Sequence, residues 1–145
     1  MNILTKTTAV LVAGLISISP ASAQDERPVG SLSITFETKE PVGKVRAVIF
    51  QSAEDFSSGK ALHAVSLSVQ DTRVFVSFPE LPTGEYAVRA FHDMDGDGEL
   101  AKNPFGIPTE PVAFSNGAKV RFGAPSWKDC KFVVTADGQS QTLSF

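Results

Sequence analysis

The sequence predicts an all-β fold, a single β-sandwich of about seven to nine strands of the immunoglobulin-like or transthyretin-like kind. Three observations lead to this prediction. From Gly30 onward, apolar and polar residues alternate with a period of two, which is typical of strands with one buried face. Turn residues recur about every eight to twelve positions, as they do in sandwiches. No segment carries a helical period long enough for more than a turn or two.

The first four strands are predicted from this alternation. The apolar residues Leu32, Ile34 and Phe36 mark one strand, and residues 45–49 mark the next. Pro41 and Gly43 break the chain between them, so the two strands either form a hairpin or lie in different sheets. Residues 65–69 and 74–78 alternate in the same way around the turn Gln70-Asp71. This second pair is a candidate hairpin.

The rest of the chain predicts one short helix and further short strands. Residues 52–62 form the only helix candidate, which Gly59 limits in length. The turn Leu81-Pro82-Thr83-Gly84 leads into a strand that continues to His92. This Leu-Pro-x-Gly-x-Tyr turn resembles the one in transthyretin-like and immunoglobulin-like exported modules, in which the tyrosine hydroxyl commonly holds the turn, and the resemblance implies the same role for Tyr86. The dipeptides Asn116-Gly117 and Asp137-Gly138 are signals of tight hairpins. They separate four predicted tail strands, residues 112–114, 119–122, 131–135 and 139–145.

The first 23 residues have the pattern of a secretory signal peptide. Lys6 precedes the apolar run 9–18, and Ala21-Ser22-Ala23 provides a small-residue cleavage site. The run is too short for a membrane span of roughly 20 residues, and no cysteine adjoins the cleavage site for lipidation. We therefore expect a mature domain of residues 24–145 that is periplasmic or secreted, without a membrane anchor, and monomeric.

Charge and cysteine content exclude several classes of function. The chain has 13 Lys and Arg against 16 Asp and Glu, a net charge of −3. This balance argues against nucleic acid or an anionic membrane surface as the partner. The single cysteine, Cys130, cannot form an internal disulfide. It is either a small buried hydrophobic residue or a thiol that crosslinks two chains.

One segment has the residue pattern of a metal site. In Asp93–Leu100, the carboxylates of Asp93, Asp95 and Asp97 alternate with other residues, and Gly98 follows them. This pattern matches the first half of an EF-hand calcium loop, in which side chains at positions 1, 3 and 5 and the carbonyl at position 7 converge on one ion. The carbonyl here belongs to Glu99.

The second half of that motif is missing, because its twelfth position is Pro104. Glu110, which follows a turn, is the predicted distal ligand, and Asp129 is a weaker candidate. Without a cation, clustered carboxylates repel one another. The sequence therefore predicts calcium as the cofactor, with acids solvated on a turn-rich loop as the alternative.

Two other interpretations stay open. Four aromatic residues in the C-terminal half could form the mouth of a site for a small apolar ligand, or could instead cap the end of the sandwich; they are Phe105, Phe114, Phe122 and Trp127. Hydrolysis at the acidic loop is the weakest interpretation. His92 adjoins Asp93, yet no serine lies in a recognisable nucleophile turn.

Four ordered motifs resemble domain of unknown function family 2141, which comprises small exported proteins of Gram-negative bacteria. The motifs span residues 91–100 (FHDMDGDGEL), 105–111 (FGIPTEP), 114–116 (FSN) and 122–127 (FGAPSW). The family pattern commonly has a further acid where this chain has Ala101, and an acidic pair where it has Lys128-Asp129. Glu110 does match the pattern, which fits a distal ligand. The resemblance implies no activity.

Together these features predict an exported, non-catalytic binding or adaptor module with a calcium loop. A carrier of a small apolar ligand, held between the sheets or at the Phe-rich loops, is the alternative. The partner is then either an envelope protein or a small ligand.

Overall fold

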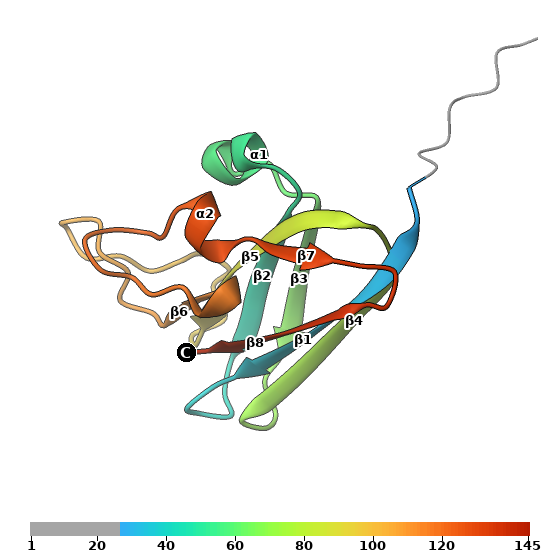
Figure 1. The fold of residues 1–145 in the computed structure, drawn as a ribbon. Coiled ribbons are helices and arrows are strands. Elements are labelled where there is room, and N and C mark those ends of the chain that lie inside the picture. The colour runs from blue at the N-terminus through green and yellow to red at the C-terminus, as the bar shows by residue number, and fades with distance from the viewer. Residues whose placement is uncertain (1–26) are drawn as a thin grey trace, which may run out of the picture.

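The computed structural model describes residues 27–145, which fold into two packed β-sheets (Figure 1). The three-stranded sheet has the order β4-β1-β8. Its central strand β1 (Val29–Glu37) pairs antiparallel with β4 (Arg73–Pro82) and parallel with β8 (Gln139–Ser144). The other sheet has the order β3-β2-β5-β6, and β7 also pairs with β5. Its strands are β2 (Lys44–Phe50), β3 (His63–Ser68), β5 (Gly84–Asp93), β6 (Val112–Phe114) and β7 (Phe132–Val134).

The predicted all-β sandwich is therefore confirmed, with eight strands in the described part of the chain. Its finer likeness to immunoglobulin-like or transthyretin-like folds stays a prediction. The predicted signal peptide, its cleavage after Ala23 and the first mature residue, Gln24, lie outside residues 27–145. Within that range, no helix is both long and apolar enough to span a bilayer.

The predicted hairpin of residues 65–78 is wrong. Strand β3 pairs with β2 in one sheet, whereas β4 pairs with β1 in the other. The turn at Gln70-Asp71 thus carries the chain across the sandwich, and the link between β1 and β2 does the same. Alternation shows which residues face inward, but a short turn does not show whether its two strands pair or face each other across the core.

The hairpins predicted at the two glycine dipeptides also do not form. Asn116 and Gly117 have the expected positive φ values, 58° and 65°, but they lie in a short 3-10 helix, η1 (Ser115–Gly117). The predicted strand 119–122 is a loop, in which Val120 and Phe122 are 50% and 109% exposed. The turn at Asp137-Gly138 joins β7 and β8, which pair with different strands.

The main core fills the space between the sheets. The inward side chains of β1, including Leu32, Ile34 and Phe36, are at most 1% exposed. Tyr86 is fully buried there, and its hydroxyl donates a hydrogen bond of 2.7 Å to the carbonyl oxygen of Pro82. The predicted role of this tyrosine in holding the turn before β5 is confirmed.

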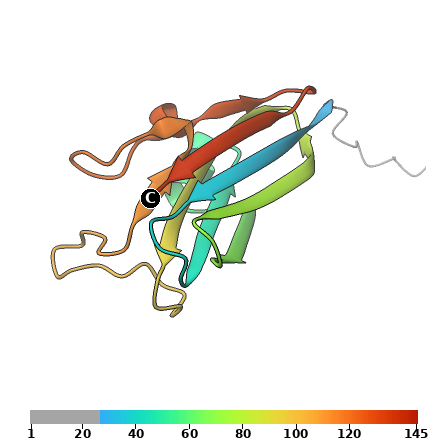
Figure 2. The same cartoon turned by 90° about the horizontal axis from the view of Figure 1, so that it is seen from below.

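A second, smaller core lies on the outer face of the β2-β5-β6 sheet. Two short helices cover that face, α1 (Ala53–Ser58) and α2 (Trp127–Cys130). Phe50 and Phe114 project outward from the sheet and pack beneath them with Phe56. Beyond the helices, the loops 94–111 and 117–126 project from the same side of the molecule (Figures 1 and 2). The candidate sites lie at these loops.

Candidate functional site

The acidic loop begins where β5 ends, at Asp93. Gly96 and Gly98 have φ values of 78° and 92°, a left-handed conformation that glycine adopts without strain. They curl the chain so that oxygens of the three predicted ligands, Asp93, Asp95 and Asp97, lie within 4.8 Å of one another. The sequence thus identified the cluster. Its geometry matches the size of a site for one hard cation.

Asp93 differs from its two neighbours because its charge is already balanced. Its side chain is fully buried, and Oδ2 accepts a hydrogen bond of 2.6 Å from Arg46 Nε. Its two oxygens also accept hydrogen bonds from the backbone amides of Gly96, at 2.7 Å, and Gly98, at 3.1 Å. The hydrogen bond from Arg46 is the largest cause that lowers the pKa of Asp93, and burial opposes it. The expectation of unpaired, mutually repelling carboxylates is therefore wrong for Asp93.

Glu110 does fold back onto the acidic loop, as predicted, but there its carboxylate binds backbone amides. Its two oxygens accept hydrogen bonds from the amides of Met94, at 2.9 Å, and Ala101, at 3.1 Å. Glu99 donates its amide to Asp97, at 2.8 Å. The weaker candidate, Asp129, caps α2 instead, because its carboxylate accepts hydrogen bonds from the backbone amide and the hydroxyl of Ser126. Those bonds lower the pKa of Asp129.

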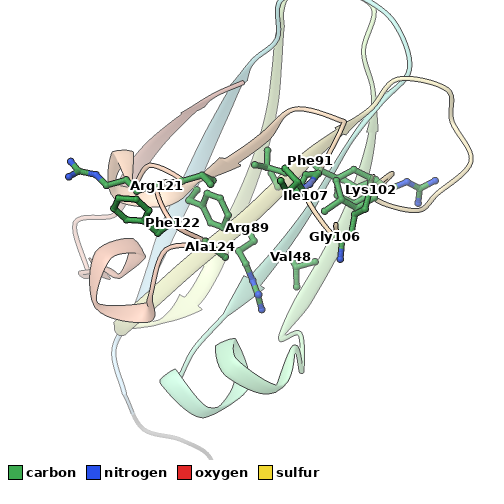
Figure 3. A pocket seen from close by; sticks show the side chains of 17 residues that line it. Val48, Arg89, Phe91, Lys102, Gly106, Ile107, Arg121, Phe122 and Ala124 are labelled. Atoms are coloured by element: carbon green, nitrogen blue, oxygen red, sulfur yellow. The ribbon is translucent and has the colours of Figure 1, made fainter. Parts of the chain in front are cut away.

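A pocket of about 660 Å³ lies beside the acidic loop, on the outer face of the sheet. Strands β2, β5 and β6 contribute to its lining, and the loops 94–111 and 117–126 border it. Figure 3 shows Arg89 and Val48 between Ile107 and Lys102 on one side and Phe122 and Arg121 on the other. The space between the two sheets is occupied by the main core. The apolar-ligand site predicted at the Phe-rich loops thus has a cavity at that place.

The four aromatic candidates divide into two groups. Phe114 and Phe122 line the pocket, whereas Phe105 and Trp127 do not. Phe105 is 88% exposed on its loop. Trp127 packs edge-on against Phe56, with ring centroids 5.8 Å apart, and belongs to the second core. Capping of a core therefore describes Trp127 and Phe114, and Phe114 also forms part of the pocket.

The pocket is positively charged within an acidic protein. Four cationic side chains and no carboxylate line it: Arg46, Arg89, Lys102 and Arg121. Arg46 is paired with Asp93. Arg89 lies against two rings, with its guanidinium carbon 4.4 Å from the centroid of Phe50 and 4.3 Å from that of Phe56. It also donates a hydrogen bond of 2.5 Å to the carbonyl oxygen of Phe56. Burial lowers the pKa of Arg89.

Two other residues with potentially reactive side chains, His92 and Cys130, are buried elsewhere. His92 is 2% exposed and faces the main core, where its Nε2 lies 2.7 Å from the carbonyl oxygen of Val42. Cys130 has no exposed surface, and burial raises the pKa of its thiol to about 11. This placement agrees with the interpretation of Cys130 as a small buried hydrophobic residue.

Comparison with protein families gives one match, to a family described as uncharacterised proteins conserved in bacteria, DUF2141, over residues 36–142. The chain belongs to the DUF2141 family. The predicted resemblance is thereby confirmed, and the match includes both the acidic loop and the loops that border the pocket. Comparisons with curated proteins and with solved structures found no match.

The cationic lining of the pocket was not predicted from the sequence of this DUF2141 domain. The signal was present in β2 and β5, because Arg46 and Arg89 occupy outward positions where Lys44–Phe50 and residues 84–92 alternate. The register of the two strands pairs Arg46 with Phe91, and Val48 with Arg89. These four paired residues therefore place their side chains on one face of the sheet. The sequence does not show that β2 pairs with β5, so it does not show that Arg46 and Arg89 lie close together.

Proposed function

We propose that this chain is an exported, non-catalytic binding protein that holds a small, mainly apolar ligand in the pocket on its outer face. The observation that carries the proposal is the cavity itself, whose volume of about 660 Å³ lies within the range of small-molecule sites. The side chains that line it are apolar or cationic. Such a lining can bind a ligand, but it supplies no pair of nucleophile and base. Export rests on the signal-peptide pattern of residues 1–23.

Exposed apolar side chains around the pocket support the same proposal. Ile107, Val120 and Phe122 are 59%, 50% and 109% exposed, and all three line the cavity. Large apolar surfaces left in water are unfavourable, and clusters of them mark binding sites. A ligand lying between the two loops would cover these side chains.

A neutral fluorescent probe tests the proposal. We expect N-phenyl-1-naphthylamine to bind wild-type protein, with one probe per chain, and to gain fluorescence. Ala124 lines the pocket and is exposed, so Ala124→Trp would fill the cavity with little effect on the core. It should weaken probe binding by about tenfold, an effect that corresponds to about 1.4 kcal/mol.

The matched control is Ala136→Trp, which adds the same side chain at an exposed turn outside the pocket lining. It should leave probe binding unchanged. A wild-type protein that does not bind the probe, or an Ala124→Trp variant that binds it as well as Ala136→Trp does, would contradict the proposed function.

Calcium binding at the acidic loop is a second candidate function, favoured by the three carboxylates within 4.8 Å. Asp95 and Asp97 are exposed, and within residues 27–145 they accept hydrogen bonds only from the backbone amides of Asp97 and Glu99. The Arg46 guanidinium beside Asp93 opposes a divalent cation. We therefore propose weak binding, of the order of 10⁻⁴ to 10⁻³ M, as in extracellular calcium modules.

A thermal melt tests this second candidate. At a calcium concentration of about 10 mM, ligand linkage stabilises the fold by about 1.4 to 2.7 kcal/mol, and the melting temperature should rise by roughly 5 to 11 °C relative to chelator. Asp95→Ala should abolish the rise. The control Asp137→Ala, at an exposed turn, should retain it. Equal melting temperatures of the wild type in calcium and in chelator would reject the calcium site.

A further inference from the structure

The charges around the pocket indicate what kind of ligand it accepts. The chain as a whole has a net charge of −3, yet no carboxylate lines the cavity. Of the four cations there, Arg46 is neutralised by Asp93. The remaining three, Arg89, Lys102 and Arg121, form no ion pair with any carboxylate of the described residues. Arg121 attracts Asp129 at longer range and so lowers the pKa of that carboxyl group. Three cations without an ion-pair partner around an apolar cavity favour a negatively charged occupant.

Arg89 is the cation best placed to bind the charged group. Lys102 and Arg121 are exposed on the two loops, whereas Arg89 lies on β5 between them and is half-buried (Figure 3). Its guanidinium points toward α1, where it contacts Phe56. Contacts with Phe50 and Phe56 fix its guanidinium, and in the described part of the chain its one hydrogen bond goes to the Phe56 carbonyl oxygen. A guanidinium has five N–H donors, so most of them stay available for an acceptor. A fixed side chain also loses little entropy when it binds.

We propose that the ligand is a single-headed anionic amphiphile, whose carboxylate pairs with Arg89 and whose apolar tail lies between the loops against Ile107 and Phe122. This inference rests on the proposed function, since it names the chemical class that the same pocket takes. A carboxylate matches the planar fork of a guanidinium and can accept two parallel hydrogen bonds. Lys102 and Arg121, at the two sides, strengthen the attraction at longer range.

The size and the lining of the cavity favour an anionic amphiphile over a small anion and over a neutral hydrocarbon. A small inorganic anion would leave the apolar lining exposed to water, and a neutral hydrocarbon would leave the half-buried Arg89 without a counterion. An amphiphile with a tail of about ten carbons satisfies both parts of the site, because each buried methylene contributes about 0.8 kcal/mol. The same loops could instead dock on an anionic membrane, and the experiment distinguishes that outcome.

Calorimetric titrations of dodecanoate and of 1-dodecanol, both below the concentrations at which they aggregate, test the inference. The two ligands share a tail and differ in the headgroup. We expect dodecanoate to bind at least about tenfold more tightly than the alcohol, as a charge-assisted hydrogen bond would predict. Arg89→Met keeps an unbranched side chain against Phe50 and Phe56, and it should reduce dodecanoate affinity to that of the alcohol.

The control is Arg73→Met, the same substitution in the opposite sheet, where Arg73 is exposed and lies 3.2 Å from Glu37. It should bind dodecanoate as the wild type does. The comparison of the two ligands on wild-type protein decides the question even if Arg89→Met does not fold. Equal affinities for the acid and the alcohol, with the neutral probe bound, would overturn the inference and leave the proposed function standing.

Two further outcomes also overturn the inference. Protein that binds neither dodecanoate nor the neutral probe would reject the ligand pocket altogether. Protein that binds vesicles of phosphatidylglycerol but not monomeric dodecanoate would show that the loops recognise a membrane surface.

Discussion

Replacing Arg46 with methionine is expected to lower the free energy of unfolding by about 3 kcal/mol at pH 7. The substitution leaves the fully buried carboxylate of Asp93 without the cation that lies 2.6 Å from it. The amides of Gly96 and Gly98 still donate to Asp93, so the loss falls at the low end of the range for a broken buried pair. Urea denaturation followed by circular dichroism measures the change.

The pH dependence gives this prediction a second measurement. The pKa of Asp93 is lowered from its ordinary value of 3.8, with Arg46 as the largest cause. A carboxyl group with a depressed pKa stabilises the fold above its unfolded pKa, and that contribution disappears as the pH falls through the lower, folded value. The stability of the wild type should therefore decrease below about pH 5. In Arg46→Met this decrease should be smaller, so the two stabilities converge in acid.

Arg73→Met is the control for the Arg46 substitution. Arg73 and Glu37 lie 3.2 Å apart, but their side chains are 66% and 37% exposed, and exposed pairs contribute little. We expect a change within about 0.5 kcal/mol. An Arg46→Met variant as stable as Arg73→Met, at neutral pH, would show that Asp93 does not depend on its partner.

The main features of the fold could be predicted from alternation, because alternation reports which face of a strand is buried. It placed β1 to β5 correctly. The role of Tyr86 at the turn before β5 was also predicted correctly, but from the resemblance of that turn to those of known modules. Alternation failed for residues 119–122, where Val120 and Phe122 alternate with cations but pair with no strand. There the apolar side chains line a pocket at the surface. Local periodicity cannot distinguish a buried face from an exposed binding face.

Only part of the candidate site could be predicted from the sequence, for a related reason. The acids of Asp93–Asp97 are neighbours in the sequence, so their spacing alone predicted that they cluster. The balancing charge, Arg46, lies 47 residues earlier, and the guanidinium of Arg89 contacts Phe56, 33 residues away. These contacts depend on how β2 and β5 pair and on where α1 packs, which short sequence patterns do not specify.

The pairing also explains why the two candidate sites are adjacent. Arg46 holds Asp93 at the start of the acidic loop and lines the pocket, and Leu100 and Lys102 follow that loop directly into the pocket wall. The hydrogen bonds of Glu110 to Met94 and Ala101 tie both ends of the acidic loop together. A rigid acidic loop therefore positions one side of the pocket. Its hydrogen bonds therefore have a structural role at the pocket even without an ion.

Phe56→Ala is expected to destabilise the protein by about 3 kcal/mol, at the lower end for a buried phenylalanine because α1 is short and can relax. Phe56 is 6% exposed and belongs to the second core. Its ring packs edge-on against Phe50 and Trp127, at centroid distances of 5.2 and 5.8 Å, and contacts the guanidinium of Arg89. Removing it leaves a cavity beneath α1. Chemical denaturation monitored by Trp127 fluorescence measures the loss.

Phe75→Ala is the matched control, because Phe75 is 67% exposed on β4. Its loss should change stability by no more than about 0.5 kcal/mol. Phe56→Leu should recover part of the stability by refilling the cavity. Equal effects of the two alanine substitutions would mean that α1 only lies on the sheet and is not packed into it. Arg89 would then lack the fixed aromatic contacts on which its proposed role in binding an anion depends.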